Sequence, residues 1–500
     1  MNELKLPDAK KLIEEALDKS LQFFENNQFR EAEVILKQLL RVDPQNVLGL
    51  QLLGLLNHKT KEYSEAIKLF LTALKIDPDN SENCNNIALS YACMGFVDKA
   101  IEYSEKSISL NPKNNHYYSN LGLHYRQKGN IDKAIECFKK SIEIDPNYFY
   151  AWSNLGAING VLKNMDEAEH CFRKAIELNP DYQPSYVDLA HVFFLRGNYQ
   201  DAWPLYEHRL EYFPPVLLLN KFYDKSKKWD GQQSLKDKKI VVYCEQGIGD
   251  FIQFVRFVPK LKTLGARVCL HTPKELISLM RQNLDVEIEE IFHEYDYHCS
   301  MISLPHLFYV DFIDPPPYLK CEKKANVENY PEFKIGIAWA GNPQHPSDRV
   351  RSCKLEYFRK IHDLPNVKLF NLQKDIRPRK YTGDSKVINL MDNCDEMRIV
   401  DATEWIENFE DTAAFISAMD LIISVDTSIL HLSGALGKKT WAILPFNPDW
   451  RWKLYDETTF WYPTMRLFRQ DTLNDWDSVF TKGFDACKQY TESAMAVIKN

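Results

Sequence analysis

The chain lacks the features that mark secreted, membrane and nucleic-acid-binding proteins. Its eleven cysteines are scattered from Cys84 to Cys487 without a C-x-x-C pair, so we expect neither a disulfide framework nor a zinc site. The N-terminus has no apolar signal core, and no apolar run approaches the ~18 residues of a membrane span. The formal net charge of −8 gives no electrostatic reason to expect a nucleic-acid partner. We therefore expect a reduced, cytoplasmic protein.

What the chain does contain in its first part is a repeat. Prolines recur every 34 residues, and alanines keep the same period; these positions are Pro44, Pro78, Pro112, Pro146, Pro180, Pro214, Ala32, Ala66, Ala100, Ala134, Ala168 and Ala202. The period and the residue types are those of the tetratricopeptide repeat. We predict about six helical hairpins over residues 13–216, within a domain of residues 1–216. Stacked hairpins bury the apolar faces that one hairpin cannot, and the stack curves into a groove.

A second set of residues keeps the same period on the first helix of each hairpin. These are Asn86, Asn120, Asn154 and Asp188, whereas the first two repeats carry Asp18 and Leu52 there. Amides on a concave face can hydrogen-bond to the backbone of an extended peptide without reading its sequence. The pattern resembles the asparagine ladder of the protein O-linked N-acetylglucosamine transferases. The alternative is that these side chains bond locally between repeats or are solvated.

The rest of the chain reads as α/β structure. We expect a linker at 217–238 that packs on both sides, because Phe222, Tyr223 and Trp229 are too apolar for a free tether. Strand-length apolar runs then alternate with amphipathic segments, which predicts parallel sheets. We predict two Rossmann-like domains at 239–325 and 332–482, and a terminal helix at 483–500.

The first of these domains opens with a strand and a glycine-bearing turn. Gly247 and Gly249 precede Asp250, which stands directly before a predicted helix at 251–264. In a parallel sheet, the turn after the first strand is where ligands bind, and glycine permits their close approach. Asp250 is therefore either a helix cap or a general base.

The second domain carries a stronger pattern between two predicted strands at 421–425 and 440–444. Asp426, Thr427 and Ser428 stand where a helix begins, and His431 follows one turn later on the same face. The unpaired N–H groups and partial positive charge of a helix start suit a phosphate. The plain alternative is an ordinary strand–cap–helix unit of an α/β domain.

Further candidates for binding a nucleotide lie on the same rim of the second domain. Arg349 and Arg351, in the long turn after the strand at 333–339, could neutralise a diphosphate or could be surface arginines. Gln373 and Asp411 lie at successive strand and helix ends, and we expect Asp411 to cap a helix at 412–419. The aromatic segments 445–452 and 461–470 are interpreted as loops that close over a ligand or pack between domains.

Two of these motifs resemble a known enzyme family. The turn Gly247-Ile-Gly-Asp250 resembles the G-D-x-I/L turn of the lipopolysaccharide heptosyltransferases, and Asp426-Thr427-Ser428 with His431 resembles their D-T-x-x-x-H motif. With the array in front, the whole chain resembles the bacterial tetratricopeptide-repeat glycosyltransferases, some of which modify flagellin. This resemblance implies a GT-B fold and an inverting transfer without a metal or another cofactor.

By the same resemblance, Asp250 would take the proton from the acceptor hydroxyl. Thr427, Ser428 and His431 would hold the donor phosphates, and Asp426 would lie near the sugar or ribose. The heptosyltransferases carry a lysine where this chain offers Arg349, Arg351 and Lys354, which leaves the identity of the donor open.

We therefore expect an all-α tetratricopeptide superhelix followed by an α/β GT-B glycosyltransferase. It would move a sugar from a nucleotide-sugar donor to a protein acceptor recruited by the groove. Two alternatives stay open. One is a glycolipid or lipopolysaccharide glycosyltransferase that uses the array for assembly, and the other is a non-catalytic adaptor.

Overall fold

A computed structural model describes residues 6–212, 224–289, 294–308, 316–343, 348–374, 397 and 399–498. Contacts within the chain group it into two compact units, one holding Met1–Ser185 and the other beginning at Tyr186. Part of the predicted linker at 217–238 lies outside the described residues, and so does the end of the predicted array, because residues 213–223 are not described.

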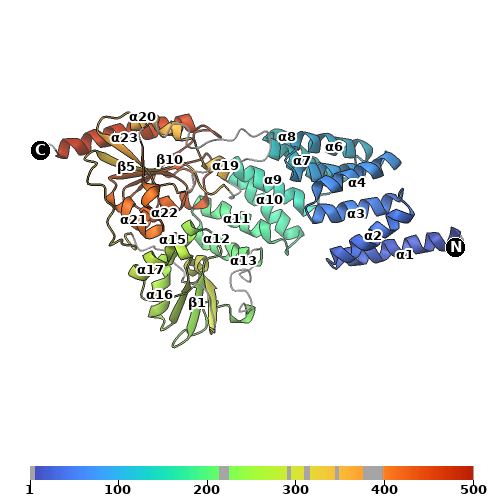
Figure 1. Ribbon diagram of the computed structural model, residues 1–500, viewed down its shortest axis with the longest axis horizontal. Helices are drawn as coiled ribbons and strands as arrows, with labels where there is room; N and C mark the ends of the chain where they lie inside the picture. Colours follow the sequence, from blue (N-terminus) through green and yellow to red (C-terminus); the bar gives the residue numbers. More distant parts are fainter. Residues whose placement is uncertain are drawn as a thin grey trace. The chain divides into compact units, whose positions relative to one another are not determined.

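The first unit is a stack of helical hairpins (Figure 1). Its helices are α1 (Leu6–Glu25), α2 (Phe29–Val42), α3 (Val47–Lys59), α4 (Tyr63–Ile76), α5 (Ser81–Cys93), α6 (Val97–Leu110), α7 (Asn115–Lys128), α8 (Ile131–Ile144), α9 (Phe149–Val161) and α10 (Met165–Leu178). A sixth hairpin, α11 (Gln183–Arg196) with α12 (Tyr199–Tyr206), lies almost wholly in the second unit. The predicted helical repeat is confirmed, although α1 begins before the predicted start at residue 13.

Two sequence features recur among the hairpins. Asparagines cap the first helices: Asn46 accepts a hydrogen bond from Gly49 N at 2.9 Å, and Asn80 accepts one from Asn83 N at 3.0 Å. A glycine on the first helix then meets a phenylalanine ring on the second, in the pairs Gly54–Phe70, Gly122–Phe138 and Gly156–Phe172. The glycine lets the ring lie against the backbone, and all three rings are buried.

The second unit contains two parallel sheets. The first has the order β3-β2-β1-β4 and comprises β1 (Lys239–Tyr243), β2 (Arg267–His271), β3 (Glu287–Glu289) and β4 (Tyr297–Ser300). Its helices are α15 (Ile248–Phe254), α16 (Val258–Thr263), α17 (Ile277–Asn283) and α18 (Leu304–Leu307). The single helix predicted at 251–264 is two helices, because Pro259 has no backbone N–H and so starts a new one.

The second sheet has the order β10-β9-β8-β5-β6-β7. Its strands are β5 (Phe333–Ala338), β6 (Val367–Asn371), β7 (Val400–Asp401), β8 (Leu421–Val425), β9 (Thr440–Leu444) and β10 (Met465–Arg469), and its helices are α19 (Asp348–Arg351), α20 (Arg359–His362), α21 (Phe409–Ala418), α22 (Ser428–Ala435) and α23 (Trp476–Ile498). Counted in chain order, the two sheets run 3-2-1-4 and 6-5-4-1-2-3. Both follow the doubly wound order of nucleotide-binding sheets, so the predicted α/β character is confirmed.

Two predictions for the end of the chain need correction. The segment 461–470 is not a loop throughout, because β10 pairs in parallel with β9 along its whole length. The terminal helix begins at Trp476 rather than at residue 483, since Trp476, Val479 and Phe480 are buried in the core of the second sheet. The aromatic-rich part of the chain after residue 461 thus supplies the edge strand β10 and the first turns of α23, which packs on the second sheet.

Candidate functional site

The two sequence motifs come together in the second unit. Helix α15 follows β1 and helix α22 follows β8, and the two helices pack against each other. Gly249 lies at this contact, where a Cβ atom would stand 2.8 Å from His431 Cδ2. Only glycine therefore allows this approach. The turn before Asp250 and the helix that starts at Ser428 form one site, although they are far apart in the sequence.

Asp250 uses its two carboxylate oxygens differently. Oδ2 accepts a hydrogen bond from Gly247 N at 2.9 Å and so caps α15. Oδ1 accepts one from Arg451 Nη2, and the side chain remains 19% exposed. Burial raises the pKa of Asp250 above its usual range, although Arg451 opposes this. The predicted cap and the predicted base are thus compatible in one residue.

Arg451 is the main residue that the sequence analysis missed. Its side chain is 6% exposed. Beside Asp250, it donates from Nε to Gln253 Oε1 at 2.6 Å and from Nη1 to Asp449 Oδ1 at 2.8 Å. The signal was an arginine between Trp450 and Trp452, because a charge in an apolar stretch must be paired when it is buried.

His431 is held in the neutral state. It is 5% exposed, its Nδ1 lies 3.0 Å from Tyr462 Oη, and its Nε2 lies 3.9 Å from Asp426 Oδ1. Burial, reinforced by Arg451, lowers the pKa of His431 to about 3. Burial raises the pKa of Asp426 to about 6, with Asp449 adding to the effect. The site therefore combines an uncharged imidazole with a weakly acidic carboxyl group.

The start of α22 offers further polar groups. Thr427 is its N-cap, but its side chain makes no capping hydrogen bond, and its Oγ1 lies 3.2 Å from Ser424 Oγ instead. Asp426, Thr427 and Ser428 are all half-buried. Backbone N–H groups at the start of an eight-residue helix and two hydroxyls can together receive an anion.

Of the two candidate arginines, Arg351 lies at the carboxyl end of β5. A Cβ atom on Gly341 would stand 2.5 Å from its Nη2, and its Nε lies 3.7 Å from Asp348 Oδ1. Its charge opposes the raised pKa of Asp426 and adds to the lowered pKa of His431. Arg349 is exposed on the same short helix.

Gln373 and Asp411 hold the backbone of their own loops. Gln373 Oε1 accepts hydrogen bonds from Trp339 N at 3.1 Å and Ala340 N at 2.8 Å, which fixes the turn after β5. Asp411 Oδ2 accepts from Glu407 N at 2.9 Å and Asn408 N at 3.2 Å. Asn408, not Asp411, is the N-cap of α21. Both side chains thus have a structural role here, and their predicted part in binding a nucleotide-sugar donor stays a prediction.

The asparagine ladder lies on successive first helices of the array. Asn86 on α5 is only 8% exposed. Asn120 on α7 donates to Asn85 Oδ1 at 2.8 Å, as the local alternative predicts. Asn154 on α9 is half-buried, and Asp188 belongs to the second unit. The peptide-binding role of these residues stays a prediction.

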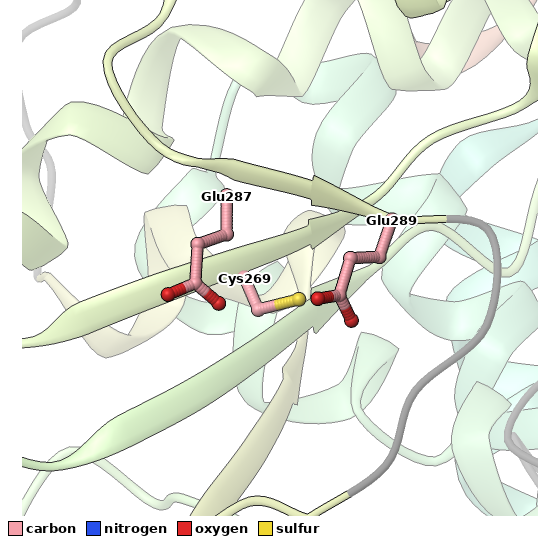
Figure 2. A group of neighbouring side chains, drawn as sticks. All are labelled: Cys269, Glu287 and Glu289. Carbon is pink, nitrogen blue, oxygen red and sulfur yellow. The ribbon is translucent and has the colours of Figure 1, made fainter.

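One group of possible metal ligands occurs among the described residues (Figure 2). It comprises Cys269, Glu287 and Glu289 on β2 and β3, whose ligating atoms lie within 4.8 Å of one another. Lys239 Nζ lies 3.0 Å from the Glu287 carboxylate, and burial raises the pKa of Cys269 to about 12. The group offers only three ligands, and one of them, Glu287, is already paired with Lys239, so we assign no metal to it.

Of the helices that the structure describes, none combines the length and the apolar character needed to cross a membrane.

Family models match the first part of the chain, and one relative aligns over a longer stretch of it. Models of the tetratricopeptide repeat match residues 17–81, 81–114, 117–148 and 149–182. Protein FlbA of Caulobacter vibrioides is 22% identical over 346 residues. That alignment covers 61% of this chain and 56% of FlbA, so the chain spans little more than half of that relative.

Two solved structures each resemble about two fifths of the chain. A tetratricopeptide repeat protein from Parabacteroides merdae is 25% identical, with a TM-score of 0.35 over 40% of this chain and 79% of that one. The pilF protein of Pseudomonas aeruginosa is 17% identical, with a TM-score of 0.37 over 42% of this chain and 94% of that one. Neither likeness bears on what this chain does. The chain thus begins with an array of tetratricopeptide repeats, which two parallel α/β sheets follow.

Proposed function

We propose that this protein is an inverting glycosyltransferase of the GT-B type. It transfers a sugar from a nucleotide-sugar donor to a side chain of a protein that the array recruits. The observation that supports this most is the contact between Gly249 and His431, which brings a carboxylate base and a phosphate-binding helix start into one site.

The donor would bind at the start of α22. The N–H groups of that helix, the Thr427 and Ser428 hydroxyls and the Arg351 guanidinium would stabilise the charge that develops on the leaving nucleotide. Burial holds the pKa of Tyr462 well above its usual range, so its hydroxyl keeps its proton and can donate to His431 Nδ1. We assign the imidazole proton to Nε2, with Nδ1 accepting from Tyr462 at 3.0 Å, so that Nε2 would donate to a phosphate oxygen.

Asp250 would act on the acceptor. The acceptor oxygen forms a bond to the anomeric carbon while the bond from that carbon to the phosphate oxygen breaks. The acceptor proton passes to Asp250 Oδ1, the oxygen that does not cap α15. A raised pKa makes this carboxylate a stronger base than an exposed aspartate. Attack on the face opposite the leaving group inverts the anomeric carbon.

The array supports a protein acceptor, because stacked helical repeats form extended binding surfaces for other chains. One observation favours the adaptor alternative. Both oxygens of Asp250 already accept a hydrogen bond, one as a cap and one from Arg451, as they would in a purely structural role. The experiment must therefore separate a base from a cap.

Asp250→Asn makes that separation, because asparagine still accepts the hydrogen bond from Gly247 N but cannot take a proton. We expect the release of nucleotide from a panel of UDP-, GDP-, ADP- and CMP-sugars to fall about 10²-fold or more. Stabilisation of the fold by the free nucleotides, measured by thermal shift, should stay as in the wild type.

Thr427→Val is the matched variant at the proposed site of the donor phosphates, because it removes the hydroxyl and keeps the shape of the side chain. It should reduce the thermal shift that the nucleotides cause. Normal nucleotide release by Asp250→Asn would remove Asp250 as the base. A wild-type protein that none of the four nucleotides stabilises would favour the adaptor alternative.

A further inference from the structure

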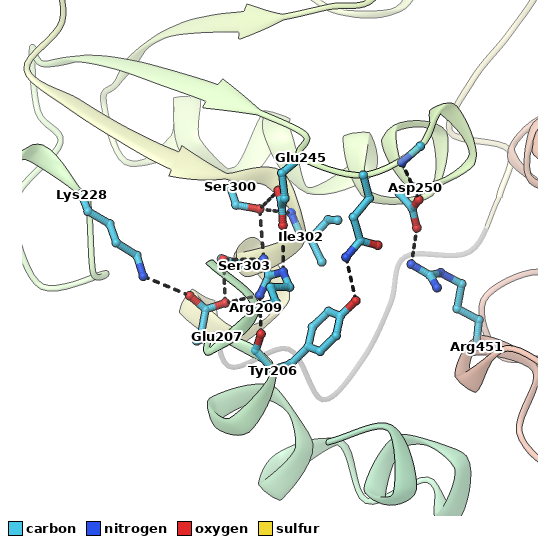
Figure 3. Close-up of polar contacts among 12 residues, drawn as sticks. Tyr206, Glu207, Arg209, Lys228, Glu245, Asp250, Ser300, Ile302, Ser303 and Arg451 are labelled. Carbon is cyan, nitrogen blue, oxygen red and sulfur yellow. Dashed lines mark hydrogen bonds and ion pairs between the residues drawn. The ribbon is translucent and has the colours of Figure 1, made fainter. Parts of the chain in front are cut away.

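A guanidinium fills the point at which the strand order of the first sheet reverses (Figure 3). The order β3-β2-β1-β4 reverses between β1 and β4, and ligands of doubly wound sheets bind outside the strand ends at such a point. Glu245 follows β1, Ser300 ends β4, and Ser300 Oγ donates to Glu245 Oε2 at 2.6 Å. Between them lies Arg209, the first residue of α13 (Arg209–Tyr212).

Arg209 is completely enclosed and completely paired. It is 1% exposed and makes five hydrogen bonds, which matches the five N–H donors of a guanidinium. Nε donates to Glu245 Oε1 at 2.8 Å, Nη1 to Tyr206 O at 3.0 Å and Glu207 Oε1 at 2.9 Å, and Nη2 to Ser300 Oγ at 3.1 Å and Ser303 Oγ at 2.9 Å. No donor is left for an incoming ligand.

The charges in this cluster balance. Burial would raise the pKa of Glu207, but Arg209 and Lys228 lower it to about 2. Lys228 Nζ lies 3.4 Å from Glu207 Oε2. The carboxylates of Glu207 and Glu245 therefore face two cations, Arg209 and Lys228. Arg209 lies at the centre of the cluster.

The same cluster holds the turn that leads to Asp250. Glu245 is its first residue and is bound to Arg209. Gln246 Nε2 donates to Tyr206 Oη at 2.8 Å, and Gly247 N donates to Asp250 Oδ2 at 2.9 Å. Three successive residues of the turn are thus fixed, two of them by side chains from the end of the array.

We infer that Arg209 is a positioning residue, which occupies the reversal point as a built-in ligand and through Glu245 sets the geometry of Asp250. Its effect on catalysis rests on the proposed function, whereas its effect on the turn does not. The first sheet accordingly takes no small ligand at its reversal point and depends on residues 206–209 to present Asp250.

The test uses the full chain with Arg209→Ala and Arg209→Lys. Hydrogen–deuterium exchange of the backbone at 245–249 should accelerate at least about tenfold in Arg209→Ala, because loss of the pairing frees the turn. Nucleotide release should fall by up to about 10²-fold, since a displacement of about 1 Å has that effect. The thermal shift caused by UDP, GDP, ADP and CMP should be unchanged.

Chemical rescue separates this role from general stability. In Arg209→Ala, millimolar guanidinium chloride should slow hydrogen–deuterium exchange at 245–249 and restore part of the rate of nucleotide release. In Asp250→Asn it should have neither effect. The matched control is Lys239→Gln, which removes an ion pair from the opposite end of β1 and should leave exchange at 245–249 unchanged.

Exchange at 245–249 that stays as slow as in the wild type would overturn the inference. Should Arg209→Ala fail to fold, Arg209→Lys and Glu245→Gln give the same readout, because each removes part of the pairing. If the wild type releases no nucleotide, the proposed function fails, and exchange alone decides the role of Arg209.

Discussion

At the scale of residues, buried polar groups in this protein are of two kinds. Arg209 and Arg451 have partners that neutralise them, so their charge is stable in the interior. His124 on α7 is only 3% exposed, and its Nε2 has no hydrogen-bond partner among the described residues. Charging such a side chain destabilises the fold.

His124 should therefore make the array sensitive to acid. Burial lowers its pKa from 6.5 to about 4, so in the window between these values the unfolded chain binds a proton that the folded chain does not. The stability that the neutral ring contributes is present above pH 6.5 and is lost as the pH falls toward 4.

His124→Ile, which introduces the residue found one repeat later at Ile158, should remove this loss. The free energy of unfolding of the variant minus that of the wild type should be about 2 kcal/mol larger at about pH 5 than at about pH 7.5. Urea unfolding of both chains at the two pH values measures this gain. An equal loss in both chains would show that His124 is not responsible.

At the scale of elements, the glycine–phenylalanine contacts decide how a hairpin closes. A Cβ atom on Gly156 would stand 2.9 Å from Phe172 Cδ1, whereas on Gly160, in the same helix α9, it would meet nothing within 4 Å. The two glycines therefore form a matched pair, one required by packing and the other not.

Gly156→Ala should destabilise the array by about 1–3 kcal/mol, because the ring must move. Gly160→Ala should stabilise it by about 0.5–1 kcal/mol, because alanine loses less backbone freedom on folding. Thermal unfolding followed by circular dichroism measures both variants. Shifts of the same sign in both would contradict the packing role of Gly156.

The elements that were predictable from the sequence are those with a strong local pattern. Strands β8 and β9 have the predicted ends, because both are apolar runs bounded by polar residues. Strand β10 was missed because aromatic residues on either side made the segment resemble a loop. The start of α22 was predictable by motif. Arg451 carried a signal as a charge in an apolar stretch, but its partner Asp250 was not predictable, since it is distant in the sequence.

At the scale of the whole molecule, the repeat period predicted the array, but the sequence held no sign that the sixth hairpin groups with the sheets. That grouping depends on long-range pairs such as Tyr206 with Gln246. Local patterns do not contain such pairs. The domain limits that we predicted at 216, 238, 325 and 482 stay predictions.

The α/β part should accordingly need the end of the array. A fragment of residues 183–500 keeps Arg209, whereas one of residues 224–500 leaves Glu245 and Ser300 without it. Loss of one partner from a buried ion pair costs about 3–5 kcal/mol, so the shorter fragment should melt roughly 10 °C lower or fail to fold. Equal melting temperatures would show that the sheets stand without Arg209.

The glycine–phenylalanine contacts also bear on how the array can have grown. The third hairpin carries Ala88 and Ser104 where its neighbours carry glycine and phenylalanine. A gene duplication that broke inside the third hairpin would join one of its helices to a helix of a neighbour and set alanine against a phenylalanine ring, or glycine against serine. The third hairpin is therefore best gained or lost as a whole, whereas the hairpins with glycine and phenylalanine can exchange single helices.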